Sequence, residues 1–359
     1  LKSNPYGAVS HAHSDQGNFY LAVDGHPLLI PSGHYQEGHE ALYASPHHAG
    51  WTWQSWAHNV PLVDGKGQAR SEDAAGQIEH FFSSALASYV RADATRSYTA
   101  ENGAEAKRVL PGFAPELLKR TGSAPVTSYR RSVLFLRPNL FVMYDDMQAD
   151  RAVTMNWLLH SWNRFAIDEP SGTVTAAEGA VKAHVRILAG ASTRIAQSNE
   201  FLIPLPEKYR KQWHLTASLP ASRHHNVIGV ISALRGDEAP AGATAVSGAG
   251  WHGASIRLAG GAAAMAAFAI NAGGQARAVA IDTPEGQATA AAVACVSGQA
   301  PWLYAADATR VEVQSKILRF SRPVDVTVAG GAATIASDTP FRIEGRGEFA
   351  AGVTNIGRD

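Results

Sequence analysis

Residues 129–144 read YRRSVLFLRPNLFVMY, and this stretch decides the expected fold. Two runs rich in apolar and aromatic residues lie on either side of Arg137-Pro138-Asn139. Aromatic and β-branched residues favour strands, whereas proline and asparagine favour turns. The stretch therefore predicts two antiparallel strands, at 129–136 and 140–144, joined by a short turn.

The same pattern recurs along the chain. Further strands are expected at residues 153–162, 181–188, 226–234, 311–320 and 324–328. Asp24-Gly25 is expected to form a tight hairpin turn, because both residues accept a positive φ at low cost. Many strands separated by turn residues predict an all-β fold built as a large antiparallel β-sandwich.

A change in composition divides the chain. Residues 236–250 read GDEAPAGATAVSGAG and are expected to form a linker or long loop. After them the chain has fewer aromatic residues and more alanine and glycine. We therefore expect a β-sandwich domain over residues 1–270 and a smaller C-terminal antiparallel β-unit over residues 271–359.

The bulk composition excludes several classes of function. Of 359 residues, 45% are apolar and 17% charged, which is typical of a globular protein. Lys plus Arg (31) equals Asp plus Glu (31), so a nucleic-acid or membrane-surface binder is not expected. The most apolar stretch, residues 260–270, is too short to span a membrane. The single cysteine, Cys295, excludes an intrachain disulfide.

Histidines and aromatic residues gather near the start of the chain. Eight of the 15 histidines fall within the first 58 residues, interleaved with tyrosine and tryptophan. Imidazoles can bind carboxylates or metals, and aromatic faces suit sugar rings. This mixture indicates a site for an acidic carbohydrate. A glycoside hydrolase would need two carboxylates beside the scissile bond, but the neighbours Asp145 and Asp146 should point to opposite faces of a strand.

Four segments then carry a family resemblance: SHAHSDQGNF (10–19), PLLIPSGHY (27–35), YASPHH (43–48) and AHNVPLVDG (57–65). In this order they resemble the β-domain of heparinase II/III-like polysaccharide lyases, and most closely the subgroup of oligoalginate lyases and exolytic heparin lyases. The resemblance implies a distorted, supersandwich-like β-sandwich. In this family an α/α toroid precedes the β-domain.

The resemblance implies β-elimination on a uronate-containing glycan, such as alginate oligomers or a heparin-like glycosaminoglycan. By position in the motifs, His11 and Tyr43 are the expected catalytic residues, His11 meeting the uronate carboxylate. The residues expected to bind substrate are Gln16, Tyr35, His47, His48 and Trp51.

The resemblance also raises the possibility of a structural zinc site. His13 and His58 match histidines that bind a structural zinc in several relatives, but Pro31 stands where those relatives have an aspartate. Zinc usually takes at least three protein ligands, and proline offers none. We therefore expect that no cofactor is required, and leave open a zinc site completed by Asp15 or His34.

The start of the chain, LKSNPYGAVSHAHSD, contains no apolar leader and reads like the middle of a protein. We expect a fragment or processed product whose partners are an acidic polysaccharide and an upstream toroid domain. Periplasm and cytoplasm both remain open as locations. The alternative function is a non-catalytic carbohydrate-binding or structural β-sandwich.

Overall fold

The computed structural model describes residues 1–33, 46–104, 106, 116, 118–190, 192–271 and 277–357. The regular structure of these residues consists almost entirely of antiparallel β-sheets, which confirms the expected all-β sandwich. The helical elements are short: η1 (His48–Thr52), η2 (Ser55–Ala57) and α2 (Thr95–Thr99). Within the described ranges, no helix has the length and apolar character needed to cross a membrane.

The first sheet has ten strands in the order β4-β5-β6-β7-β12-β10-β9-β8, with β3 beside β7 and β11 beside β12. Its strands are β3 (Leu62–Val63), β4 (Gln77–Ser83), β5 (Ala87–Asp93), β6 (Val126–Leu136), β7 (Leu140–Ser161), β8 (Ala166–Asp168), β9 (Thr173–Glu178), β10 (Val181–Leu188), β11 (Arg194–Ser198) and β12 (Trp213–Arg235). The expected strands at 129–136, 140–144, 153–162, 181–188 and 226–234 all lie in this sheet, and one long strand, β7, contains two of them.

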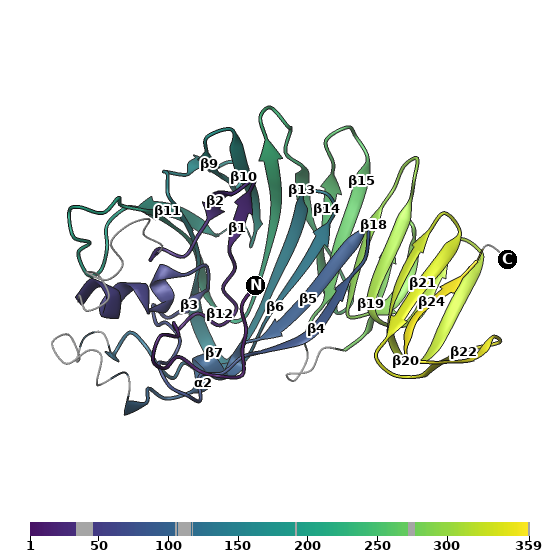
Figure 1. Cartoon of the computed structure of the whole chain (residues 1–359), viewed down its shortest axis with the longest axis horizontal. Helices are drawn as coiled ribbons and strands as arrows, with labels where there is room; N and C mark the ends of the chain where they lie inside the picture. Colours follow the sequence, from purple (N-terminus) through teal and green to yellow (C-terminus); the bar gives the residue numbers. More distant parts are fainter. Residues whose placement is uncertain are drawn as a thin grey trace.

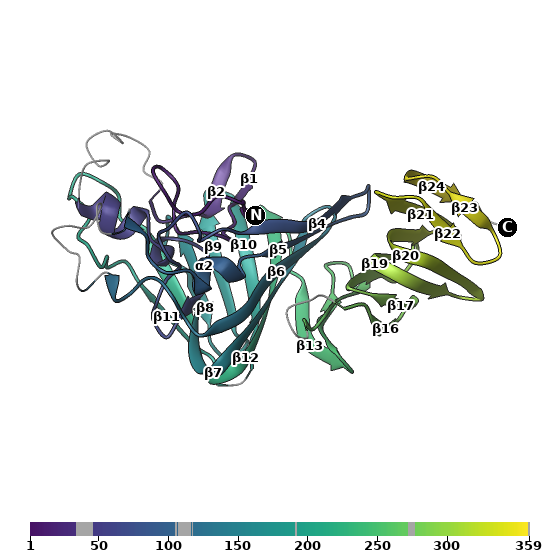
Figure 2. The same cartoon turned by 90° about the horizontal axis from the view of Figure 1, so that it is seen from below.

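The second sheet has twelve strands, whose central order is β13-β14-β15-β18-β19-β20-β21-β24. Its strands are β13 (Gly242–Gly248), β14 (Trp251–Arg257), β15 (Ala263–Ala269), β16 (Val279–Thr283), β17 (Gly286–Ala290), β18 (Ala292–Val296), β19 (Trp302–Val313), β20 (Lys316–Ala329), β21 (Ala332–Ser337), β22 (Phe341–Ile343), β23 (Gly347–Phe349) and β24 (Gly352–Ile356). Figures 1 and 2 show this sheet, in green to yellow, extending away from the N-terminal segment.

Buried side chains place the two sheets in layers. Leu134 and Val142 of the first sheet share one core with Phe268 and Tyr304 of the second. The other face of the first sheet is covered by the N-terminal segment, which includes the hairpin of β1 (Leu21–Val23) and β2 (His26–Leu29). The hairpin turns at Asp24-Gly25, as expected, and both residues have a positive φ. The described parts of the histidine-rich motifs, residues 10–19, 27–33, 46–48 and 57–65, belong to the N-terminal segment, drawn in purple to blue in Figure 1.

Two expectations were wrong. Residues 236–250 are not a linker, because β13 lies within them and pairs with β14 along the edge of the second sheet. Its small side chains, GATAVSG, hide the strand signal that larger residues would give. Residues 311–320 are not one strand, because β19 and β20 meet there in a hairpin with Gln314 at φ 56°. The apolar runs on both sides made the sequence look continuous.

The expected boundary at residue 270 falls after β15, inside the second sheet. The chain passes from the first sheet to the second between Arg235, the end of β12, and Gly242, the start of β13. The division into domains at 1–270 and 271–359 stays a prediction.

A buried ion pair fastens the N-terminal layer to the first sheet. The Arg131 guanidinium on β6 donates to both carboxylate oxygens of Asp145 on β7, at 2.7 and 2.6 Å, and both side chains are fully buried. Its remaining terminal nitrogen donates to the carbonyl oxygens of Gly17 (2.7 Å) and Asn59 (2.5 Å). Trp157 donates to the same carboxylate at 2.6 Å. The pair therefore holds two separate parts of the covering segment.

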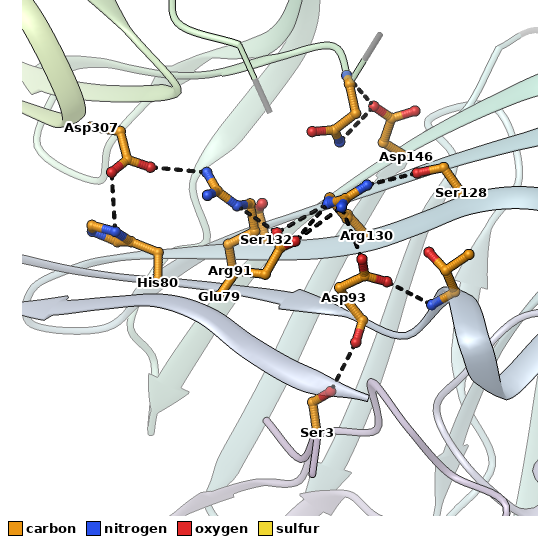
Figure 3. Close-up of polar contacts among 12 residues, drawn as sticks. Ser3, Glu79, His80, Arg91, Asp93, Ser128, Arg130, Ser132, Asp146 and Asp307 are labelled. Carbon is orange, nitrogen blue, oxygen red and sulfur yellow. Dashed lines mark hydrogen bonds and ion pairs between the residues drawn. The ribbon is translucent and has the colours of Figure 1, made fainter. Parts of the chain in front are cut away.

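A second network links the edge of the first sheet to the second sheet (Figure 3). His80 on β4 lies between Asp307 and Asp325 of the second sheet, at 3.3 and 3.0 Å. Arg91 on β5 bridges Asp307 and Glu79, at 3.1 and 2.9 Å. Burial by itself would lower the pKa of His80, but the hydrogen bonds that its ring donates to the Asp307 and Asp325 carboxylates outweigh burial and raise that pKa to about 9. His80 is therefore charged at neutral pH and contributes to holding the two sheets together.

Replacing Arg131 with methionine should destabilise the protein by about 3–5 kcal/mol, because Asp145 would keep a buried, uncompensated charge. Urea unfolding measures the change. The matched control is Arg151→Ala, which breaks an exposed ion pair with Asp64 and should cost less than about 1 kcal/mol. Equal losses for the two variants would show that the buried pair does not fasten the segment.

Candidate active site

A tight turn presents His11 at the surface. Ser10, directly before it, has φ 53°, a left-handed conformation that is uncommon for serine. The buried Arg70 holds this turn from below, because its guanidinium donates to the carbonyl oxygens of Ser10 (2.8 Å) and Ala12 (2.9 Å). The same guanidinium lies 4.3 Å from the centre of the Trp53 ring. His11 is thus an exposed imidazole on a firmly held turn, as a substrate-binding group should be.

Three more histidines, His13, His48 and His58, lie close to one another next to this turn. The Nδ1 atom of His13 lies 3.1 Å from Nε2 of His58, and the ring of His48 makes an edge contact with the ring of His13 at 6.5 Å. Burial and neighbouring positive charge lower the pKa values of His13 and His58 to about 3, so both rings are neutral. The structure thus brings together the two residues expected to bind metal, from segments 45 positions apart.

Asp15 completes a possible ligand set, because one potential ligand atom each from His13, Asp15 and His58 lie within 4.8 Å of one another. Two observations argue against a metal there. The ammonium of Lys2 is in direct contact with the Asp15 carboxylate. Nε2 of His58 lies 3.1 Å from the carbonyl oxygen of Thr52 and 3.1 Å from Nδ1 of His13, so this nitrogen is used in contacts within the fold, whereas its buried Nδ1 has no hydrogen-bond partner among the described residues. Because Lys2 already compensates the Asp15 carboxylate, this arrangement of the described residues does not offer a three-ligand zinc site.

Gln16 is buried, and its side-chain amide is used within the fold. The side-chain oxygen accepts from the backbone of Asn4 at 2.9 Å, and the nitrogen donates to the carbonyl of Tyr6 at 3.0 Å. Its backbone N–H donates to Gln68 at 2.7 Å. A direct contact with substrate, expected from the sequence, would require these bonds to open.

Trp51 and His47 lie in an aromatic cluster with Phe201 and His214. The indole nitrogen of Trp51 donates to the carbonyl of Ser32 at 2.8 Å, and its ring lies 4.9 Å from Phe201 and 4.7 Å from His214. His47 is buried and its Nδ1 donates to a backbone carbonyl at 2.7 Å. The Trp51 side chain is only 5% exposed, so its role as a stacking platform for sugars stays a prediction.

His160 on β7 is a buried core residue. Its ring nitrogens lie 3.2 Å from the side-chain oxygen of Asn59 and 3.0 Å from the carbonyl of Trp56. Burial lowers its pKa to about 3 and that of the neighbouring His214 to about 2. Both imidazoles are therefore neutral, and both are part of the support beneath the candidate site.

The structure also separates the two neighbouring carboxylates. Asp145 points toward Arg131 and the N-terminal layer, whereas Asp146 accepts from Asn271 at 2.7 Å and contacts His224 at 2.6 Å. The opposite directions confirm that they do not form the carboxylate pair of a glycoside hydrolase.

The expected site residues Tyr35 and Tyr43, and the alternative zinc ligand His34, lie outside the described residues. The sequence missed the residues that hold the site. Arg70 and Arg131 donate to backbone carbonyls 58 to 114 positions away, and Lys2 pairs with Asp15, 13 positions away. Neither the polar stretches around Lys2 and Arg70 nor the apolar strand around Arg131 contain a local signal of these partners.

Lowering the pH should unfold the protein progressively, because His160 and His214 must stay neutral in the fold. Their pKa rises from about 3 or 2 in the fold to the usual 6.5 on unfolding, so the unfolded state binds more protons. The contribution to stability is complete above pH 6.5 and falls by about 1.4 kcal/mol per pH unit for each histidine below it. Urea unfolding at pH 7.5, 6 and 5 measures the slope; equal stabilities would contradict neutral burial.

Comparison with known proteins adds the family. The sequence model for "Heparinase II/III-like, C-terminal" matches residues 1–202. No curated protein sequence matches the chain significantly.

Solved structures show the same fold. A heparinase III, the BT4657 gene product, superposes with a TM-score of 0.54 at 15% identity, over 75% of this chain and 38% of that one. The heparan sulfate lyase HepC from Pedobacter heparinus gives 0.53 at 15%, over 73% and 37%. The chain thus spans well under half the length of these proteins. Because the family model covers more than half of it, the chain belongs to the heparinase II/III-like C-terminal domain family.

Proposed function

We propose that this chain is the β-domain of a polysaccharide lyase and that His11 contacts the uronate carboxylate during β-elimination. The observation that carries the proposal is the turn at His11, in which an exposed imidazole follows a residue with positive φ and is held from below by Arg70. Family membership supports the reaction class. The similar structures named as heparinase III and heparan sulfate lyase support an acidic glycan as substrate.

β-Elimination needs three chemical events at the uronate. The C5 proton is weakly acidic, so a hydrogen-bond donor or cation must neutralise the adjacent carboxylate as negative charge develops. A base removes the proton, and an acid protonates the departing glycosidic oxygen. We assign carboxylate binding to His11 and protonation of the leaving oxygen to Tyr43. An upstream helical domain would supply the opposite wall of the cleft.

The buried histidines make a different contribution. Neutral imidazoles offer one N–H donor each and no charge, so His13, His47 and His58 support the loop instead of forming a cationic patch. His48, half-buried and next to His13, extends the polar surface beside His11. Both an alginate oligomer and a heparin-like glycan contain the uronate that this arrangement would recognise, and the two are the substrates to test.

Replacing His11 with alanine should reduce the rate of lyase activity by about 100-fold or more, because the carboxylate would lose its partner in the transition state. The assay is ultraviolet absorbance of the unsaturated uronate product, with alginate and heparin oligomers supplied to the full gene product. His26→Ala is the matched control, since His26 is an exposed histidine on β2. Full activity in His11→Ala would remove His11 from the site, and no product from either glycan would refute a uronate lyase.

Arg70→Met should lower kcat by about tenfold or more while changing KM little, because the turn would no longer hold His11 in its reactive position. Arg70→Lys can keep one of the two carbonyl contacts and should recover part of kcat. Thermal unfolding of both variants separates positioning from stability. Equal kcat values for the two variants at equal stability would show that Arg70 does not position His11.

A further inference from the structure

The cluster of His13, Asp15 and His58 has a cation from the same chain next to it, because the Lys2 ammonium contacts the Asp15 carboxylate. Asp15 is only 7% exposed at its side chain, so its carboxylate needs a compensating positive charge. The contact with the Lys2 ammonium supplies that charge, and Asn18 adds a weaker hydrogen bond at 3.4 Å.

The backbone fixes Lys2 in this position. The N–H of Lys2 donates to the carbonyl of Asn18, and the N–H of Gly17 donates to the carbonyl of Lys2, both at 2.7 Å. These two bonds align the start of the chain with the loop that carries Asp15. The ammonium reaches the carboxylate because its backbone is held on the same loop.

The Lys2 ammonium and the Asp15 carboxylate carry opposite unit charges and cancel each other. A zinc ion bound to Asp15 would have to displace the ammonium or share the carboxylate with it, and like charges at such a short separation repel. The Asp15 side chain is only 7% exposed and the Lys2 side chain 36% exposed, so the ammonium and a metal ion compete for one carboxylate that a single cation already compensates.

We propose that the Lys2 ammonium takes the place of a metal ion in the cluster of His13, Asp15 and His58, so that this chain keeps the cluster without a metal. Pro31 agrees with this inference, because a proline side chain offers no ligand to a metal ion. The inference does not depend on the proposed lyase activity, since it concerns only what stabilises the cluster.

The test replaces Lys2 with methionine, which keeps the length and apolar stem of the side chain but removes the charge. The purified native protein should hold no stoichiometric zinc, and a chelator should leave its unfolding midpoint unchanged. Lys2→Met should unfold at a lower temperature, and Zn²⁺ should restore the midpoint. Calorimetry should show Zn²⁺ binding at least roughly tenfold tighter to the variant than to the native protein.

Two further variants make the result specific. Lys211→Met removes another lysine from an ion pair, with Glu200 at the surface, and should show no response to zinc. The double variant Lys2→Met, His13→Ala should lose the rescue by zinc. One equivalent of chelatable zinc in the native protein would overturn the proposal. So would a Lys2→Met protein with unchanged stability, or one that is destabilised and does not respond to zinc.

Discussion

The ion pair of Arg131 and Asp145 is the interaction on which the rest of the site depends. A guanidinium has five N–H donors on three nitrogens. Two of the Arg131 nitrogens donate to the Asp145 carboxylate, and the third donates to two backbone carbonyl oxygens. Those carbonyls belong to Gly17 and Asn59, which lie next to the two halves of the histidine cluster. A single side chain in the first sheet thereby sets the separation between segments about forty residues apart.

Anchoring this layer on the sheet decides the chemistry of its histidines. Where the layer covers the sheet, imidazoles are withdrawn from water, and desolvation favours their neutral form. His58 and His160 are therefore buried supports, each with two hydrogen-bonding contacts inside the fold. His11 differs because it is exposed, on a turn whose carbonyl groups accept hydrogen bonds from Arg70. The histidines of the N-terminal layer thus include the exposed His11 as well as buried imidazoles that are neutral.

The same physical constraint governs both buried carboxylates of the site. Asp145 is compensated by Arg131, and Asp15 is compensated by Lys2. Lys2 and Asp15 are 13 positions apart within the N-terminal layer, whereas Arg131 and Asp145 are 14 positions apart and face each other on neighbouring strands of the first sheet.

The sequence by itself determined the all-β architecture, most strands of the first sheet, and the motifs that place the chain in its family, because alternation and turn residues are local properties. It also indicated that Asp145 and Asp146 face opposite ways. Only the tertiary structure decided that β13 is a strand, that Trp51 and Gln16 are buried, and that Lys2, Arg70 and Arg131 hold the site. These outcomes depend on which carbonyls, carboxylates and rings meet across long separations in sequence, and burial then sets whether each histidine carries a charge.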